Sequence, residues 1–104
     1  MKKLHIDTSS NERVLISLIT EEDKKDLVRE TPSRKNQLVL LLIQELLQEQ
    51  KIDFSDITEI SVIVGPGSFT GVRVGVTIAN TLGTLLQIPI NDQKVGKLVE
   101  PVYE

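Results

Sequence analysis

The pattern of hydrophobic and polar residues predicts three strands in the first third of the chain. Residues 4–8 and 13–20 (RVLISLIT) are short segments rich in Leu, Ile and Val, and a polar turn at 21–24 leads to a third strand at 25–30. Connections this short cannot return the chain for parallel pairing, so we expect an antiparallel meander.

A helix is predicted over residues 33–50, opened by Pro32 and Ser33. Its middle is apolar almost all round, whereas a surface helix keeps its apolar residues on one face. A two-layer domain of this size covers only one side of such a helix. We therefore expect another structure to cover the other side.

The second half of the chain predicts a buried strand followed by a helix. Residues 58–64 (TEISVIV) are rich in Ile and Val and are interpreted as a strand in the interior of a sheet. The expected elements after it are, in order, a glycine-rich loop at 65–71, a helix at 70–86, a short strand at 88–91, a helical turn at 93–99 and a tail at 100–104.

The element order βββαβαβ is that of a ribonuclease-H-like unit. We expect one α/β domain with a mixed five-stranded sheet over residues 1–92, followed by a C-terminal turn and tail at 93–104. Two such units make the actin-like ATPase architecture, which holds nucleotide between two lobes. One unit cannot close such a cleft, so intrinsic ATPase activity is not expected.

Small residues recur every four positions along the second helix. Gly71, Gly75, Ala79 and Gly83 form one shallow row, which allows another backbone to approach closely. Each interior glycine costs roughly 1 kcal/mol of helix stability relative to Ala, which suggests a packing reason for the row. We interpret it as a helical interface, and expect Gly75→Leu to abolish association while leaving the fold.

Composition excludes several classes of function. The 104 residues suit one domain, and a net charge of -3 argues against a general nucleic-acid binder. The chain has no cysteine and a single histidine, His5, which excludes thiolate catalysis and His-rich metal sites. The first residues lack a signal-peptide core and the longest apolar run has six residues, 38–43, so we expect a cytoplasmic protein that does not enter a membrane.

The glycine-rich loop and the end of the first strand are candidate sites for an anion. The loop lacks the lysine of a P-loop and the third glycine of a dinucleotide fingerprint. It ends at a helix N-terminus, whose free N–H groups bind anions, but it also reads as a tight turn with Thr70 as N-cap. The residues of this possible anion site are Asp7, Thr8, Ser9, Gly65, Gly67, Ser68 and Thr70.

No metal or catalytic site is expected. Asp7 stands where nucleases of this architecture hold a metal-binding aspartate, but the matching end of the fourth strand carries no acid, and Asp7 can instead bond its own turn. His5 reads as a packed strand residue. Arg73 is the single charge between Ile60 and Asn91, and it is either a solvated charge or a contact to a partner.

Two motifs resemble the bacterial TsaB (YeaZ) family. They are the sequence DTSS at 7–10 and GPGSFTGVRVGV at 65–76, and the resemblance covers residues 1–92 as the N-terminal subdomain of the family. It implies a noncatalytic partner of the kinase-like subunit TsaD, acting with the ATPase TsaE in making threonylcarbamoyladenosine at position 37 of tRNA. In this role the chain would contact tRNA only indirectly and need no cofactor.

The resemblance also implies pairing through the two helices, with TsaD or with a second copy. The residues we expect at this interface are Leu38, Leu41, Leu42, Leu46, Gly71, Val72, Arg73, Gly75, Val76, Ala79 and Gly83. The tail at 99–104 is similar to the far C-terminal segment of the family, which suggests a shortened single-domain member. Lys35 stands where the family often has His, so no role of that His is carried over.

Two other functions stay open at this point. A homodimer could hold a nucleotide between two single-domain lobes, at residues 7–10 and 65–71. Alternatively, the chain could be a self-associating relative that has lost the role in tRNA modification.

Overall fold

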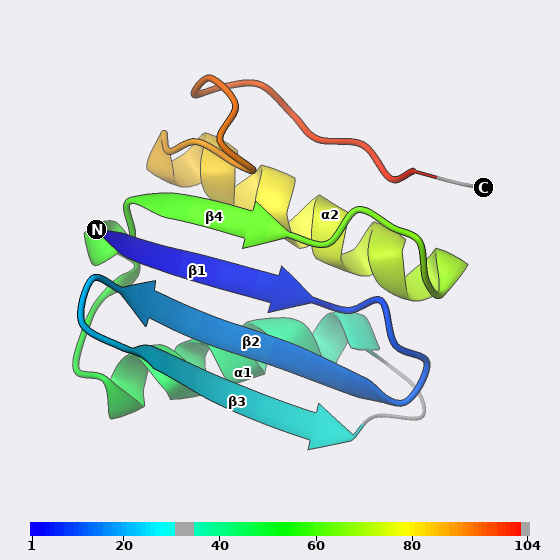
Figure 1. Cartoon of the computed structure of the whole chain (residues 1–104), viewed down its shortest axis with the longest axis horizontal. Helices are drawn as coiled ribbons and strands as arrows, with labels where there is room; N and C mark the ends of the chain where they lie inside the picture. The colour runs from blue at the N-terminus through cyan, green and yellow to red at the C-terminus, as the bar shows by residue number, and fades with distance from the viewer. Residues whose placement is uncertain (31–34, 103–104) are drawn as a thin grey trace.

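The computed structural model describes residues 1–30 and 35–102, and it consists of one sheet with two helices (Figure 1). The strands lie in the spatial order β3-β2-β1-β4. The elements in chain order are β1 (Lys2–Asp7), β2 (Arg13–Thr20), β3 (Lys24–Glu30), α1 (Lys35–Glu49), the short 3-10 helix η1 (Phe54–Asp56), β4 (Glu59–Val62) and α2 (Phe69–Leu86).

The predicted meander is confirmed. Strand β1 pairs antiparallel with β2, and β2 pairs antiparallel with β3, across the tight turns that the polar residues form. After α1 the chain returns on the far side of β1, where β4 pairs parallel with it from Lys3↔Glu59 to Ile6↔Val62. The sheet is therefore mixed, with α1 as the crossover that parallel pairing requires.

The fifth strand is not confirmed, because only one bridge forms where it was expected. Ile90 pairs in parallel with Ile60, and neither neighbour extends the ladder. Instead, the side-chain amide of Asn91 forms hydrogen bonds with the next backbone groups of β4. Its Oδ1 accepts from the Val62 N–H at 2.8 Å, and its Nδ2 donates to the Val62 carbonyl at 3.1 Å. Asn91 and Asp92 both have positive φ, so the chain turns away at this point.

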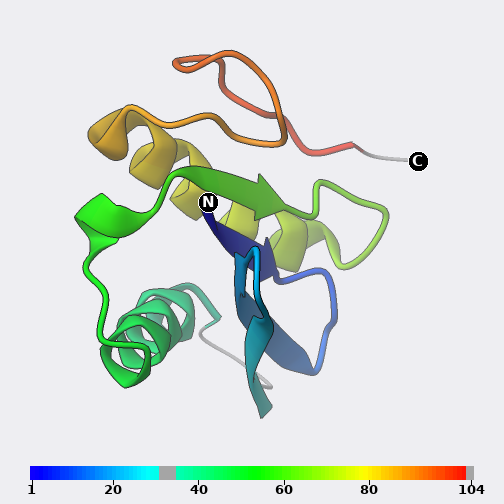
Figure 2. The ribbon, with the colours of Figure 1, turned by 60° about the vertical axis from the view of Figure 1, so that its left-hand side comes forward.

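Both helices cover the same face of the sheet, as Figures 1 and 2 show from two directions. Helix α1 packs against β2 and β3, and α2 packs against β4 and β1. Alternate strand residues point into this layer, including Leu4 and Ile6 of β1 and Ile16 of β2, all fully buried. The helices contribute a complementary set of apolar side chains, among them Val39, Ile43 and Ala79, so the core lies between one sheet face and two helices.

The other face of the sheet carries a polar row in one register. His5 lies between Ser17 of β2 and Ser61 of β4, and Ser17 lies opposite Asp26 of β3. The Ser17 hydroxyl donates to Asp26 Oδ1 at 2.6 Å, and His5 Nδ1 lies 3.0 Å from Ser61 Oγ. Burial lowers the pKa of His5 below its ordinary value of 6.5, and Lys24 and Lys3 lower it further, against the opposite influence of Asp7 and Asp26.

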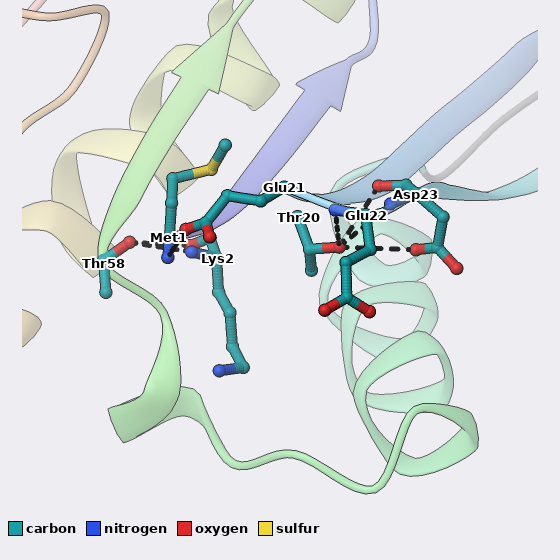
Figure 3. Close-up of polar contacts among 7 residues, drawn as sticks. All are labelled: Met1, Lys2, Thr20, Glu21, Glu22, Asp23 and Thr58. Atoms are coloured by element: carbon teal, nitrogen blue, oxygen red, sulfur yellow. Dashed lines mark hydrogen bonds and ion pairs between the residues drawn. The ribbon is translucent and has the colours of Figure 1, made fainter.

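The N-terminus is tied to the turn between β2 and β3 (Figure 3). The terminal ammonium donates to Glu21 Oε1 at 2.7 Å, and this bond lowers the pKa of the Glu21 carboxyl. On the other side, the Lys2 N–H donates to Thr58 Oγ1 at 2.9 Å. These bonds connect the first residues of the chain to the β2–β3 turn and to Thr58, just before β4.

The segment after Asn91 contains turns in place of the helical turn expected at 93–99, and it lies beside α2 (Figure 2). The side chain of Asn80 holds it, donating to the Val99 carbonyl and accepting from the Val99 N–H, both at 2.9 Å. Farther on, the Val102 N–H donates to the Val64 carbonyl at 2.7 Å. Val99 is buried, so the segment is anchored to the domain at this residue, while residues 92–98 are exposed.

The lowered pKa of His5 predicts how acid affects stability. The fold favours neutral His5, so its contribution is complete above the unfolded pKa of about 6.5 and is lost as the pH falls below that value. We expect His5→Asn, whose amide can still reach Ser61, to lose less stability than the wild type between about pH 7.5 and about pH 5.5. Urea unfolding of both proteins at the two pH values measures this difference. Equal losses would show that His5 does not titrate differently in the folded chain.

Candidate protein-interaction site

A groove separates the N-terminal halves of α1 and α2 on the side away from the sheet. It is a hollow of about 360 Å³ lined by three apolar and three polar or charged residues: Leu40, Val74 and Ile78, with Thr70, Arg73 and Thr77. We call it the α1–α2 groove. Both helices begin at the same end of the sheet and run the same way, so the groove lies at their shared N-terminal end (Figure 1).

Large apolar side chains are exposed on the two helices that form the groove. Leu40 of α1 is 44% exposed, its neighbour Leu41 is 61% exposed, and Phe69 at the start of α2 is 57% exposed. Single exposed leucines are common on protein surfaces, but a group of them around a hollow is typical of an interaction site.

Arg73 is the one charged residue of the groove lining. Its guanidinium lies over the Phe69 ring, 5.4 Å from the ring centroid, so the ring face attracts the cation and holds it in place. Arg73 is otherwise exposed. The groove therefore presents an oriented positive charge beside apolar surface.

The expected interface residues divide into two groups in the structure. Leu41 and Arg73 are exposed, and Leu38 is half-buried. The other eight are buried in the chain's own core and cannot contact a partner in this fold: Leu42, Leu46, Gly71, Val72, Gly75, Val76, Ala79 and Gly83. The expectation that another structure covers the outer side of α1 stays a prediction, and it now rests on the exposed residues Leu40 and Leu41.

The small-residue row faces the sheet, which corrects its interpretation as a contact to another chain. A Cβ added at Gly75 would collide with Thr8 Oγ1 and lie 3.5 Å from Val62, and a Cβ at Gly83 would lie 2.5 Å from Ile90. The close approach is therefore within the chain: at Gly75 between α2 and the ends of β1 and β4, and at Gly83 between α2 and the segment that follows it. Since substitution at Gly75 would disturb the core, the expectation that Gly75→Leu leaves the fold intact is wrong.

Several residues in or beside the groove were not predicted: Leu40, Phe69 and Thr77, which are exposed, and Val74 and Ile78, which are half-buried. One signal in the sequence could have found them. Because the row of small residues marks the inner side of α2, the large residues on the opposite side of the same helix must point outward.

At the possible anion site, hydrogen bonds within the chain use the polar groups of the strand end. Asp7 Oδ1 accepts from the Ser9 N–H at 3.0 Å and from the Ser9 hydroxyl at 2.6 Å. Thr8, fully buried, donates to the Gly71 carbonyl at 2.5 Å. The Ser68 N–H donates to the Ser9 carbonyl at 2.8 Å. The loop and the strand end thus bond directly to each other.

The start of α2 also differs from the expectation. Ser68 is the N-cap in place of Thr70, and its hydroxyl accepts from the Gly71 N–H at 3.3 Å. A Cβ at Gly67 would lie 2.7 Å from Ser9, so the loop packs against the end of β1 there. Gly65 is close to the carbonyl of Val102, while Thr70 faces the groove.

Over residues 1–30 and 35–102, no three His, Asp or Glu side chains gather as a metal site would require. Within the same ranges, no helix is long and apolar enough to cross a membrane.

Comparison with known proteins places this fold in a family. The family model described as "TsaD: tRNA N6-adenosine threonylcarbamoyltransferase" matches residues 29–92. The tRNA threonylcarbamoyladenosine biosynthesis protein TsaB of Bacillus subtilis is 36% identical over 124 aligned positions that cover 100% of this chain and 50% of the relative. The TsaB of Escherichia coli is 31% identical, with 86% of this chain and 38% of the relative covered. The structure of YeaZ from Pseudomonas aeruginosa superposes with a TM-score of 0.81 at 30% identity.

The chain belongs to the TsaB (YeaZ) family. The superposition with YeaZ covers 86% of this chain and 43% of YeaZ. The chain thus spans about half the length, or less, of its TsaB relatives. These TsaB relatives are named for the biosynthesis of one tRNA modification, threonylcarbamoyladenosine.

The inward orientation of Gly75 gives a prediction about stability. We expect Gly75→Leu to lower the free energy of unfolding by about 3 kcal/mol, because the new side chain overlaps Thr8 and Val62. Thr84→Leu introduces the same side chain at an exposed position of the same helix and should change stability by less than about 0.5 kcal/mol. Urea unfolding of both variants measures the difference. A stable Gly75→Leu protein would mean that α2 does not pack on the sheet as described.

Proposed function

We propose that this chain is a noncatalytic partner of a TsaD-like subunit in the biosynthesis of threonylcarbamoyladenosine at position 37 of tRNA. The observation that carries the proposal is the α1–α2 groove, a partly apolar hollow lined by exposed Leu40, together with exposed Leu41 on the same helix. Burying such a surface against a partner removes apolar area from water, which is the main driving force of protein association. A protein with this role acts in the cytoplasm and meets tRNA only through the complex.

The family comparison supports a TsaD-like subunit as the partner. A model named for the TsaD transferase matches 29–92, the region that contains both helices, while the relatives matched across most of this chain are named TsaB. Two proteins that both contain this helix pair can associate through the same face of each protein, as the subunits of a symmetric dimer do. A TsaE-like ATPase would join this pair as a third component.

The internal bonding at the strand end supports the noncatalytic part of the proposal. In an actin-like ATPase this edge of the sheet faces the nucleotide, whereas here Asp7 and Thr8 are bonded to Ser9 and Gly71. The same bonding disfavours the homodimer that would hold a nucleotide between two lobes. We further propose that the domain is a ribonuclease-H-like unit in which the single Ile60–Ile90 bridge represents the fifth strand.

The proposal predicts that a charge placed in the exposed apolar surface prevents association. We expect Leu41→Asp to weaken binding to the TsaD-like subunit of the same organism by about a hundredfold, because a carboxylate would be buried at the interface. Leu41 is mostly exposed in the free chain, so its stability should change little. Calorimetric titration and light scattering on a sizing column measure the binding.

The matched control is Val95→Asp, which introduces the same carboxylate at an exposed apolar residue of the C-terminal segment. It should bind like the wild type. If neither the wild type nor Val95→Asp forms a complex, the chain is not a partner of that subunit. If the chain instead forms only homodimers, self-association without the modification role is the better account.

A further inference from the structure

Strand β3 is an edge of the sheet, because β2 lies on one side of it and no described strand lies on the other (Figure 1). An edge strand presents unpaired N–H and carbonyl groups, to which a strand of another chain can add. The turn before β3 shows which groups these are. The Thr20 N–H donates to the Asp23 carbonyl at 2.9 Å, so every second pair of β2 and β3 from there is hydrogen-bonded. The backbone groups that point outward belong to the alternate residues Lys24, Asp26, Val28 and Glu30.

The other edge of the sheet, at β4, is occupied by the chain itself. The Ile60 N–H donates to the Pro89 carbonyl at 3.0 Å, and the Ile60 carbonyl accepts from the Asn91 N–H at 2.9 Å. The side chain of Asn91 bonds both backbone groups of Val62. The open edge of the described sheet is therefore the one at β3.

The side chain of Arg29 covers the middle of this open edge. Its Nη1 donates to the outward carbonyl of Val28 at 3.0 Å, and its Nη2 donates to Glu45 Oε1 of α1, also at 3.0 Å. A guanidinium holds its N–H donors in one rigid plane, so the two bonds together fix it across the carbonyl. Within residues 1–30 and 35–102, no other group bonds an outward backbone group of Lys24, Asp26 or Val28.

A second copy of the chain is a suitable strand to add at this edge. The symmetric arrangement pairs β3 with β3 of the copy in antiparallel fashion about a two-fold axis. Since opposite residues must share one face of the sheet, all four outward residues are used when the pair is centred on Leu27. Lys24 then lies opposite Glu30 of the copy, so opposite charges meet at both ends of the pair. In the middle, the Val28 carbonyl must accept the Asp26 N–H of the copy.

Arg29 opposes this pairing in two ways. Its Nη1 already occupies the Val28 carbonyl, which is the acceptor that the copy needs. In the same register, Arg29 lies opposite Lys25 of the copy, and like charges directly opposite each other destabilise a strand pair. A two-fold pair contains every contact twice, so both effects count twice.

We propose that Arg29, held by Glu45, blocks strand addition at the β3 edge, and that a second copy of this chain pairs with β3 when the block is removed. The inference is separate from the proposed function, because it concerns the edge of the sheet and leaves the α1–α2 groove aside. It explains why a seven-residue edge strand with complementary charges at its two ends has its central acceptor covered by a side chain of its own.

The test compares three variants by sedimentation. Arg29→Met removes the charge and the donors and keeps a long side chain. Arg29→Lys keeps the charge but lacks the planar group that reaches Val28 and Glu45 together. Lys94→Met removes an exposed charge from the C-terminal segment and is the matched control. The side chain of Arg29 is 45% exposed, so these changes should leave the core intact, and urea unfolding confirms this first.

We expect Arg29→Met to dimerise about tenfold more tightly than the wild type, and Arg29→Lys about threefold more tightly because it keeps only the charge repulsion. Lys94→Met should stay within about twofold of the wild type. Adding Val28→Pro to Arg29→Met should restore wild-type association. Proline has no N–H, and the N–H at this position points outward, so the change removes a donor from the edge without removing a bond to β2.

Glu45→Gln provides a second test that leaves β3 unchanged, and it serves if Arg29→Met does not fold. It removes the carboxylate that holds the guanidinium, and the Glu45 side chain is 42% exposed. We expect this variant to dimerise about threefold more tightly than the wild type.

Amide hydrogen exchange then locates the contact. The N–H groups of Asp26 and Val28 should exchange rapidly in the wild type and slowly in the Arg29→Met dimer. If Arg29→Met and Glu45→Gln associate no more than the wild type, Arg29 does not block the edge. If Val28→Pro fails to suppress the association of Arg29→Met, the contact lies elsewhere and the inference is wrong. Slow exchange of both groups in the wild type would mean that the edge is already paired, which also overturns it.

Discussion

The close approach of α2 to the ends of β1 and β4 determines most of what is distinctive in this structure. Gly75 lies against Thr8 and Val62, at a distance that no side chain larger than hydrogen allows. Thr8 uses this proximity to donate its hydroxyl to the Gly71 carbonyl, which belongs to the first turn of α2. One buried threonine thus joins the end of β1, the glycine-rich loop and the helix that follows it. The isoleucine at position 90 makes the corresponding contact with Gly83 at the other end of α2.

This contact also explains why Arg73 and the exposed residues of α2 lie on the side of the helix away from the sheet. Residues three or four positions apart share one side of a helix, so residues between the small ones point to other sides. Among these, Arg73, Val74 and Ile78 line the α1–α2 groove together with Leu40, and Arg73 lies over the Phe69 ring. The row of glycines brings the helix to the sheet, and the groove is the outward consequence of the same packing.

The described domain differs from the expected one mainly after Leu86. Where a fifth strand would continue, Asn91 bonds β4 through its side chain and the backbone turns away. The following segment is anchored by Asn80 and by Val64 in place of a ladder. Side-chain amides thus hold the end of this domain, in bonds that a pattern of hydrophobic residues cannot reveal.

The sequence alone determined the meander, both helices to within a few residues at their described ends, and the family, because periodicity, turn residues and the motif at 65–76 are local signals. It also marked Arg73, the single charge between Ile60 and Asn91. It did not determine which side of α2 is buried. A row of small residues shows only that a neighbouring structure approaches the helix closely. That neighbour can be either a second chain or the protein's own sheet. Tertiary structure decided between them, because only the packing of α2 over Thr8, Val62 and Ile90 shows where the close neighbour lies.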